Sequence, residues 1–198
     1  MSLCELAEIY GSDKCPKINH NYTPAYHTIL SNHRDRIKTM IEIGVGNPEL
    51  MSPIVGESYK AGASLRMWRD YFKNAFIYGC DIREDVLFEE DRIKCLYLDQ
   101  SSPKSLSNLC VSMMEKHGAI DIILDDGSHI PEHQKISFEY LWNLVKPGGF
   151  YIIEDIFVDM CEITKLPEVL QFTDCRLVYV HKCNKIGGFV CFKKLDDE

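Results

Sequence analysis

Short apolar segments alternate with longer segments of mixed polarity along this chain. The apolar segments are rich in β-branched residues, as buried parallel strands are. The segments that fit this pattern are Thr39–Gly44, Phe76–Cys80, Ile93–Tyr97, Ile120–Leu124 and Phe150–Ile153. Because helical segments lie between them, they predict an α/β fold with a mostly parallel sheet and helices on both faces.

The intervening segments carry apolar residues at helical spacing. Between residues 65 and 72, the side chains of Leu65, Trp68 and Phe72 fall on one helix face. Proline favours the first turn of a helix, so helices are predicted to begin at Pro103 and at Pro131. Their predicted stops are Gly118 and the sequence Lys146-Pro147-Gly148-Gly149.

The end of the chain holds two further predicted strands, Cys175–His181 and Gly188–Phe192. A glycine-rich turn at Gly187-Gly188 separates them. Such a turn is too short for a crossover connection, so this closing pair is predicted to be antiparallel.

Composition narrows the class of protein. The chain has 198 residues, of which 45% are hydrophobic and 26% charged, enough for one well-buried domain. A net charge of -8 argues against a nucleic-acid partner, which would need clustered Lys and Arg. No apolar run is long enough to span a membrane, and Glu5 and Glu8 do not fit a signal peptide. A cytoplasmic protein with no membrane partner is expected.

Nine cysteines are present, but none forms a Cys-x-x-Cys pair. An odd number of cysteines within apolar segments favours reduced, buried thiols over a disulfide framework or a zinc site.

Carboxylates follow two of the predicted strands. Leu124 leads into Asp125, Asp126 and His129, and Ile153 leads into Glu154-Asp155. The carboxyl ends of parallel strands meet at one edge of a sheet, where ligands bind. Clustered carboxylates beside a histidine predict a hard cation and a proton acceptor, a combination that suits activation of a hydroxyl group.

The first predicted strand ends in a glycine turn, Gly44-Val45-Gly46, without the third glycine of a dinucleotide fingerprint. Glu42 suits a ligand with an ammonium group better than a pyrophosphate, which points to S-adenosylmethionine. Asp81 is placed to hold ribose hydroxyls, and Asp99-Gln100 lies near the expected adenine position. The alternative for Asp81 and Asp99 is that they only cap helices.

A longer set of motifs resembles the class I methyltransferases that methylate sugar hydroxyls, the mycinamicin and macrocin O-methyltransferase type. The motifs are Glu42-Ile43-Gly44-Val45-Gly46, Gly62-Ala63-Ser64-Leu65-Arg66-Met67-Trp68, Tyr78-Gly79-Cys80-Asp81-Ile82, Asp99-Gln100, Asp125-Asp126-Gly127-Ser128-His129, Lys146-Pro147-Gly148-Gly149 and Glu154-Asp155.

The resemblance implies a Rossmann-like fold with a mostly parallel seven-stranded sheet and an antiparallel C-terminal strand. It implies Mg²⁺ or Mn²⁺ held by Asp126, Glu154 and Asp155, with His129 as general base. It implies S-adenosylmethionine bound by Glu42, Gly44, Gly46, Ser64, Asp81, Ile82, Asp99, Gln100 and Asp125. Residues 1–38 would form a helical lid segment and residues 39–198 the methyltransferase domain. The acceptor would be a sugar or nucleotide-sugar, and a homo-oligomer is compatible with this family.

Several alternatives stay open at this point. Asp125 competes with Asp126 as a metal ligand, because adjacent strand residues point to opposite sides. His133 is a second, weaker candidate base. The segment Gly11–Lys14, with His20, Tyr22 and Tyr26, resembles the entry segment that lies over the cofactor in this family, and the alternative is a surface loop before a helix.

Three other functions compete with sugar methylation. An NAD-dependent sugar oxidoreductase would need a fuller glycine fingerprint and a Tyr-x-x-x-Lys pair. A non-catalytic cofactor-binding module is disfavoured by the intact set of carboxylates and histidine. The acceptor could also be a non-sugar diol or a catechol-like molecule. The chain departs from the family pattern in its long connection between Asn47 and Ala61, and the additional N-terminal domain of larger family members is not expected here.

Overall fold

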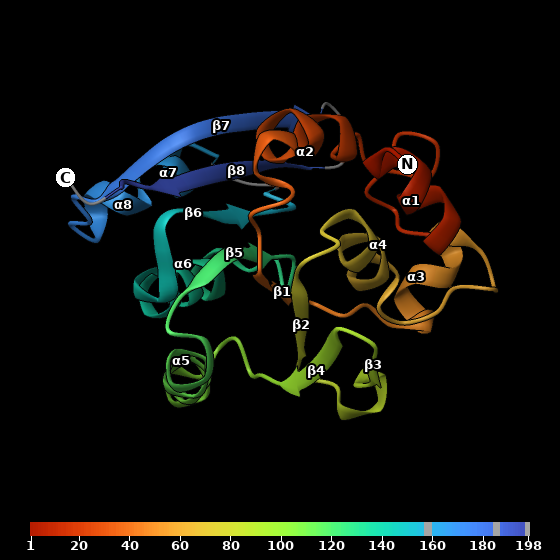
Figure 1. Cartoon of the computed structure of the whole chain (residues 1–198), viewed down its shortest axis with the longest axis horizontal. Coiled ribbons are helices and arrows are strands. Elements are labelled where there is room, and N and C mark those ends of the chain that lie inside the picture. The colour runs from red at the N-terminus through yellow and green to blue at the C-terminus, as the bar shows by residue number, and fades with distance from the viewer. Residues whose placement is uncertain (157–159, 184–186, 197–198) are drawn as a thin grey trace.

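The computed structural model describes residues 1–156, 160–183 and 187–196. They form one eight-stranded sheet in the order β3-β4-β2-β1-β5-β6-β8-β7 (Figure 1). The strands are β1 (Thr39–Ile43), β2 (Phe76–Asp81), β3 (Glu89–Glu90), β4 (Ile93–Tyr97), β5 (Ile120–Asp125), β6 (Val145–Ile153), β7 (Cys175–Cys183) and β8 (Gly187–Lys194).

The strand directions confirm the predicted α/β class. Strand β1 lies at the centre and pairs in parallel with β2 and β5, and β4 and β6 extend the parallel part. Strand β8 pairs antiparallel with both β6 and β7, as the short closing turn predicts. The sheet has eight strands rather than seven, because β3 pairs antiparallel with β4. Its two residues, Glu89 and Glu90, are charged and exposed, so no apolar pattern marks this strand.

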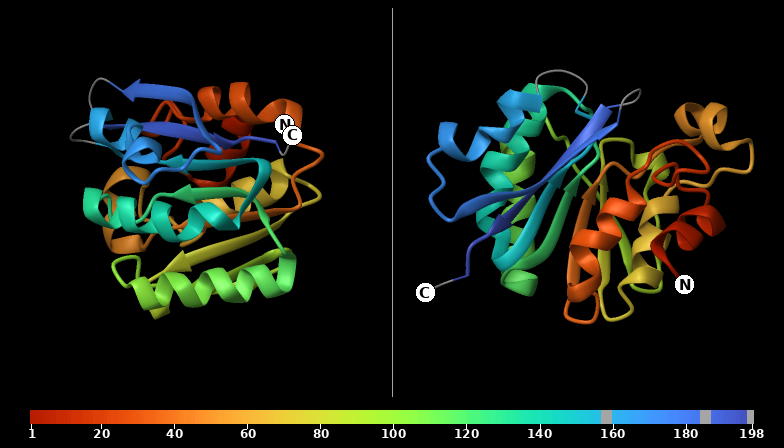
Figure 2. Two further views of the ribbon diagram at one scale, coloured as in Figure 1. Left: turned by 90° about the vertical axis from the view of Figure 1, so that its left-hand side faces the viewer. Right: turned by 90° about the horizontal axis from the view of Figure 1, so that it is seen from above.

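Helices cover both faces of the sheet (Figure 2). The helices are α1 (Leu3–Tyr10), α2 (Thr23–Leu30), α3 (Pro48–Val55), α4 (Ala63–Tyr71), α5 (Pro103–His117), α6 (Pro131–Leu141), α7 (Met160–Thr164) and α8 (Leu166–Val169), with short 3₁₀ turns at Ser31–His33, Glu84–Val86 and Trp142–Leu144. The predicted starts at Pro103 and Pro131 are confirmed.

Alternate residues of the strands face two separate apolar cores. Met40 of β1 packs in a core with Leu6 of α1 and Trp68 of α4, whereas Ile41 packs in a second core with Leu106 of α5 and Phe138 of α6. This alternation is the two-residue period of a strand buried on both faces. The N-terminal helices therefore share a core with the sheet.

The predicted break at Lys146-Pro147-Gly148-Gly149 lies inside β6. Ile120 pairs with Val145, but Ile122 pairs with Phe150, so these residues form an irregular extension of the strand. Gly148 adopts a φ of +74°, and a bulge tolerates proline and glycine where a regular strand would not.

The prediction of buried thiols is confirmed for four of the described cysteines, whereas Cys4, Cys110 and Cys175 are only partly buried. Cys4, Cys15, Cys80, Cys95, Cys110, Cys175 and Cys191 are all free thiols. The side chains of Cys161 and Cys183 fall outside the described part. Within the described residues, no helix combines the length and apolar character that crossing a membrane requires.

Candidate active site

A cavity of about 630 Å³ lies at the carboxyl ends of the parallel strands. Most of the predicted site residues line it, and they come from segments far apart in the chain. The lining includes Gly44, Gly46, Ser64, Asp81, Ile82, Asp99, Gln100, Asp126, His129 and Asp155. The predicted residues Glu42, Asp125 and Glu154 are buried and do not line it.

The glycine turn after β1 is shaped by contacts within the protein. Gly44 has a φ of +97°, and a Cβ there would lie 2.0 Å from the carbonyl oxygen of Asp126. A Cβ on Gly46 would lie 2.3 Å from Tyr59 Oη. Both positions need glycine because the backbone must pass close to neighbouring groups in a left-handed conformation.

Asp81 holds this turn in place. Its Oδ2 accepts a hydrogen bond of 2.9 Å from the backbone N–H of Val45, and its Oδ1 accepts one of 3.0 Å from Arg83 N–H. Asp99 accepts hydrogen bonds from the backbone N–H and the hydroxyl of Ser101. Neither aspartate is a helix N-cap, since Arg83 and Ser102 occupy those positions, so the capping alternative is wrong; both aspartates organise local backbone and border the cavity.

Asp125 is buried behind the cavity wall and bound by Gln100. The Nε2 of Gln100 donates to both carboxylate oxygens of Asp125 at 2.7 Å. Burial raises the pKa of Asp125 to about 7. Between the two candidate ligands, Asp126 faces the cavity and Asp125 does not.

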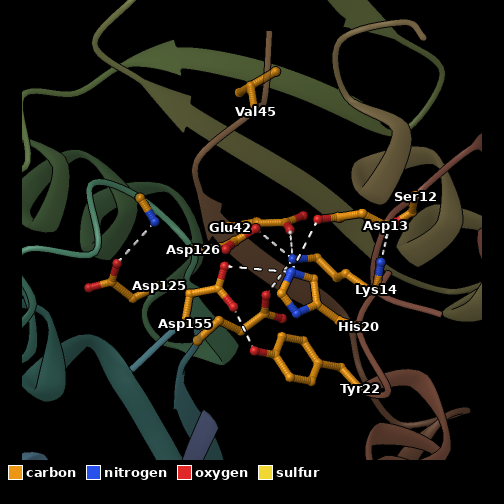
Figure 3. A network of polar contacts seen from close by, with 12 residues as sticks. Ser12, Asp13, Lys14, His20, Tyr22, Glu42, Val45, Asp125, Asp126 and Asp155 are labelled. Carbon is orange, nitrogen blue, oxygen red and sulfur yellow. Dashed lines mark hydrogen bonds and ion pairs between the residues drawn. The ribbon is translucent and has the colours of Figure 1, made fainter. Parts of the chain in front are cut away.

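The predicted metal carboxylates come together where β5 and β6 end (Figure 3). Ligand atoms of Asp126, His129 and Asp155 lie within 4.8 Å of one another. Glu154 is buried; its Oε2 lies 2.5 Å from Lys14 Nζ, and its Oε1 accepts a hydrogen bond from Tyr26 Oη. The atoms closest to forming a metal site are therefore those of Asp126, His129 and Asp155.

The charges in this cluster influence one another strongly. Burial raises the pKa of Glu154 well above its usual value, and burial also raises the pKa of Asp155. Burial acts the same way on Asp126, but the neighbouring Lys14 and His129 outweigh it and lower the Asp126 pKa. The pKa of Lys14 is raised well above normal despite its burial, because Asp126, Glu154 and Glu42 surround the ammonium.

His129 follows Asp126 in a turn where its own φ is +58°. Its Nε2 lies 3.8 Å from Asp155 Oδ2, and its side chain borders the cavity. The alternative base, His133, also borders the cavity, with Nδ1 2.9 Å from Ser128 Oγ. His129 is the one that lies with the carboxylate cluster.

The N-terminal segment supplies side chains that the sequence patterns left undecided. Lys14 enters the carboxylate cluster, and Tyr22 Oη donates to Asp155 Oδ1 at 2.5 Å. His20 Nε2 lies 3.8 Å from Asp155 Oδ2. The segment is therefore part of the site rather than a surface loop; the only sequence signal for this was the resemblance of Gly11–Lys14 to the family.

The residues present fit both a divalent cation and an ammonium-bearing cofactor. The converging carboxylate oxygens of Asp126 and Asp155 suit a hard ion such as Mg²⁺ or Mn²⁺, and the imidazole of His129 lies beside them. Neither oxygen of the buried Glu42 carboxylate makes a hydrogen bond within the described residues, and burial raises its pKa to about 7. Lys14 Nζ lies 3.6 Å from Glu42 Oε1, and a buried carboxylate beside the cavity attracts a cationic group when it is ionised.

No protein-family model matches the sequence. The 8-demethyl-8-alpha-L-rhamnosyl tetracenomycin-C 2'-O-methyltransferase of Streptomyces olivaceus is 41% identical over 154 residues, which cover 78% of this chain and 37% of that protein. The demethylmacrocin O-methyltransferase of Streptomyces fradiae is 38% identical over 155 residues, 78% of this chain and 36% of that protein. The chain thus spans less than two fifths of the length of these relatives.

A solved structure is also similar. The MycE methyltransferase from the mycinamycin biosynthetic pathway, in complex with Mg, SAH and mycinamycin VI, matches 99% of this chain and 55% of its own, with a TM-score of 0.75 and 28% identity. The fold of this solved structure and the names of the sequence relatives point to the same class of protein as the motifs that line the cavity. The chain has the class I methyltransferase fold and, over 78% of its length, is similar to S-adenosylmethionine-dependent sugar O-methyltransferases of the mycinamicin and macrocin group.

Proposed function

We propose that this protein transfers the methyl group of S-adenosylmethionine to a hydroxyl group of a sugar, with Mg²⁺ or Mn²⁺ and with His129 as general base. The observation that carries this proposal is the single cavity that connects the glycine turn and Asp81 with Asp126, His129 and Asp155. A methyl donor and a metal-bound acceptor must meet in one space for transfer to occur.

The cofactor would occupy the end of the cavity nearest β1, β2 and β4. Gly44 and Gly46 allow the ligand to approach the backbone, and Asp81 offers carboxylate oxygens to ribose hydroxyls. Asp99 and Gln100 border the region proposed for adenine, and the half-exposed Ile82 offers it an apolar contact.

Asp126, Glu154 and Asp155 would hold the divalent ion, with Asp126 and Asp155 facing the cavity. When bound, such an ion lowers the pKa of an alcohol that it coordinates. His129 would accept the hydroxyl proton on its imidazole. Asp155 Oδ2, 3.8 Å from His129 Nε2, would stabilise the imidazolium that results.

The acceptor class follows from the site and from the relatives. Hard oxygen ligands that leave positions on the ion suit two neighbouring hydroxyl groups, as a sugar presents them. The relatives are named for rhamnosyl tetracenomycin and for demethylmacrocin, both acceptors of an O-methyl group. We infer a nucleotide-sugar or a glycosylated small molecule for this chain.

Two measurements test the proposal. Calorimetry should detect binding of S-adenosylhomocysteine and little binding of NAD; the reverse result would overturn the cofactor assignment. Labelled S-adenosylmethionine should then methylate a member of a panel of nucleotide-sugars and glycosides, and a chelator should abolish this turnover.

The metal is tested with Asp126→Asn, which should lose turnover while S-adenosylhomocysteine still binds. The matched control is Glu115→Gln on the exposed face of α5, which should keep full activity. If Asp126→Asn retained full, chelator-resistant activity, the metal role would have to be abandoned.

A further inference from the structure

Lys14 is a buried cation at the point where three strands end. Its side chain is only 2% exposed, and its Nζ lies 2.5 Å from Asp126 Oδ2, 2.5 Å from Glu154 Oε2 and 3.6 Å from Glu42 Oε1. These carboxylates follow or belong to β5, β6 and β1, which are neighbours in the sheet. One ammonium group therefore faces a carboxylate from each of three adjacent strands, and Figure 3 labels Lys14 with two of these carboxylates, Glu42 and Asp126.

The backbone around Lys14 is fixed independently of this contact. The carbonyl oxygen of Lys14 accepts hydrogen bonds from Tyr22 N–H at 3.1 Å and Thr23 N–H at 3.0 Å. The preceding carbonyl, of Asp13, accepts one of 2.7 Å from His20 N–H. The loop between α1 and α2 thus holds the lysine in position, rather than leaving a flexible side chain to find a partner.

The cluster has more negative than positive groups. Asp13 and Asp155 border the cavity together with Asp126, one of the three carboxylates that Lys14 contacts, and the imidazoles of His20 and His129 face Asp155. Buried carboxylates this close together repel one another and need a counter-charge. Among the described residues, the ammonium of Lys14 is the positive group that hydrogen-bonds directly to both Asp126 and Glu154.

We propose that Lys14 is a positioning residue, a built-in cation that holds Glu42, Asp126 and Glu154 together before a divalent ion binds. Lys14 thus links Glu42, the carboxylate proposed to attract the cofactor, to Asp126 and Glu154, the carboxylates proposed to hold the metal. The N-terminal segment is accordingly an obligate part of the site.

A space-filling role and a charge-supplying role of Lys14 predict different effects of Mg²⁺ on stability. If Lys14 only fills space, its loss lowers stability equally with and without a divalent ion. If it supplies positive charge, Mg²⁺ partly replaces it, because both cations neutralise the same carboxylates. The stabilisation by Mg²⁺ is then larger in a variant without the lysine charge.

The test compares Lys14→Met with wild type by thermal unfolding in a chelator and in Mg²⁺. In the chelator, the melting temperature of Lys14→Met should fall by roughly 6 to 20 °C, because buried carboxylates lose their partner. Added Mg²⁺ should raise it by more than it raises that of wild type. Lys17→Met, which removes an exposed lysine paired with Glu8, should change neither value.

A second substitution tests the charge directly. Glu154→Gln in the Lys14→Met background should restore part of the lost melting temperature, because it removes one of the uncompensated charges. If Lys14→Met alone does not fold, recovery of folding in this double variant supports the proposal, and failure to recover overturns it.

Three other results would overturn the proposal: an unchanged melting temperature of Lys14→Met in the chelator, additive losses in the double variant, or a measurable stabilisation by Mg²⁺ that is equal in both proteins. Absence of any Mg²⁺ effect in both proteins would instead count against the proposed metal site. The Mg²⁺ comparison rests on the proposed metal site, whereas the chelator and double-variant measurements do not. Failure of the methyltransferase proposal is therefore distinguishable from failure of this one.

Discussion

The side-chain amide of Gln100 lies 2.7 Å from both carboxylate oxygens of Asp125. Its carbonyl oxygen Oε1 accepts a hydrogen bond of 3.0 Å from Ser128 N–H. One glutamine after β4 therefore fixes the turn that follows β5 and carries Asp126 and His129. A Cβ on Gly127 would lie 2.4 Å from the same Oε1, so this turn and Gln100 pack tightly.

Gln100→Ala should consequently destabilise the protein by about 1 to 3 kcal/mol, since buried Asp125 and the backbone of Ser128 lose their partner. Denaturant unfolding in the absence of ligands measures this loss. Asn108→Ala on the exposed side of α5 is the control and should change stability little. A loss for Gln100→Ala no larger than for Asn108→Ala would show that the contact does not hold the turn.

Gly44→Ala should be more damaging than a glycine substitution in open space. Gly44 and Gly56 have φ angles of +97° and +114°, so alanine is strained at both, by about 1 to 3 kcal/mol. No atom lies within 4 Å of a Cβ on Gly56, whereas a Cβ on Gly44 would meet the Asp126 carbonyl oxygen at 2.0 Å. We expect Gly44→Ala to unfold at a clearly lower denaturant concentration than Gly56→Ala and to bind S-adenosylhomocysteine more weakly. Equal stability of the two variants would contradict the close approach.

Glu42 should make stability depend on pH in a defined direction. Burial raises its pKa in the folded protein from 4.5 to about 7, so the folded state binds the proton more tightly than the unfolded chain. The contribution of Glu42 to the free energy of unfolding is fully present below about pH 4.5. It is lost as the pH rises through 7, a change of about 3 kcal/mol.

The variant Glu42→Gln lacks this titration. Measured without cofactor, the unfolding free energy of wild type should therefore fall relative to that of Glu42→Gln between pH 5 and pH 8. Glu115→Gln serves as the matched exposed control and should track wild type at every pH. A constant difference for Glu42→Gln would mean that Glu42 is already ionised at the lower pH.

Asp81→Ala should weaken S-adenosylhomocysteine binding by about 1 to 3 kcal/mol, the range for hydrogen bonds to a charged group. The variant loses contacts proposed for the ribose and also the hydrogen bond that Val45 N–H donates to Asp81 Oδ2. Calorimetry measures the affinity, and thermal unfolding separates the two effects. Unchanged affinity would place the nucleoside elsewhere.

His129→Ala should lower single-turnover methylation by about 10² to 10⁴-fold while S-adenosylhomocysteine affinity stays nearly unchanged. The wild-type rate should fall at acidic pH, because a protonated imidazole cannot accept the hydroxyl proton. The competing account is that the metal activates the alcohol enough for water to serve as base. Near-identical pH profiles of wild type and His129→Ala would support that account, and His133→Ala would then test the second histidine.

Much of the site was predictable because it lies at strand ends. Gly44 and Gly46 directly follow β1, and Asp126 and Asp155 follow β5 and β6 within two residues. Apolar periodicity locates the strands, and parallel strands bring their carboxyl ends to one edge. Strand β3 and the bulge at 146–149 were not predicted in this form, because pairing there depends on a neighbouring strand rather than on a local apolar pattern.

The sequence alone determined the α/β class, the positions of the main strands along the chain and the chemistry at their ends, because each depends on residues that are close neighbours in the chain. Only the tertiary structure decided which of Asp125 and Asp126 faces the cavity, that Glu42 is buried, and that Lys14 lies among the carboxylates. Lys14 is 112 residues from Asp126 and 140 from Glu154 along the chain. Contacts at such separations depend on how the N-terminal helices pack against α4 and the sheet, and no periodicity within a short segment encodes that packing.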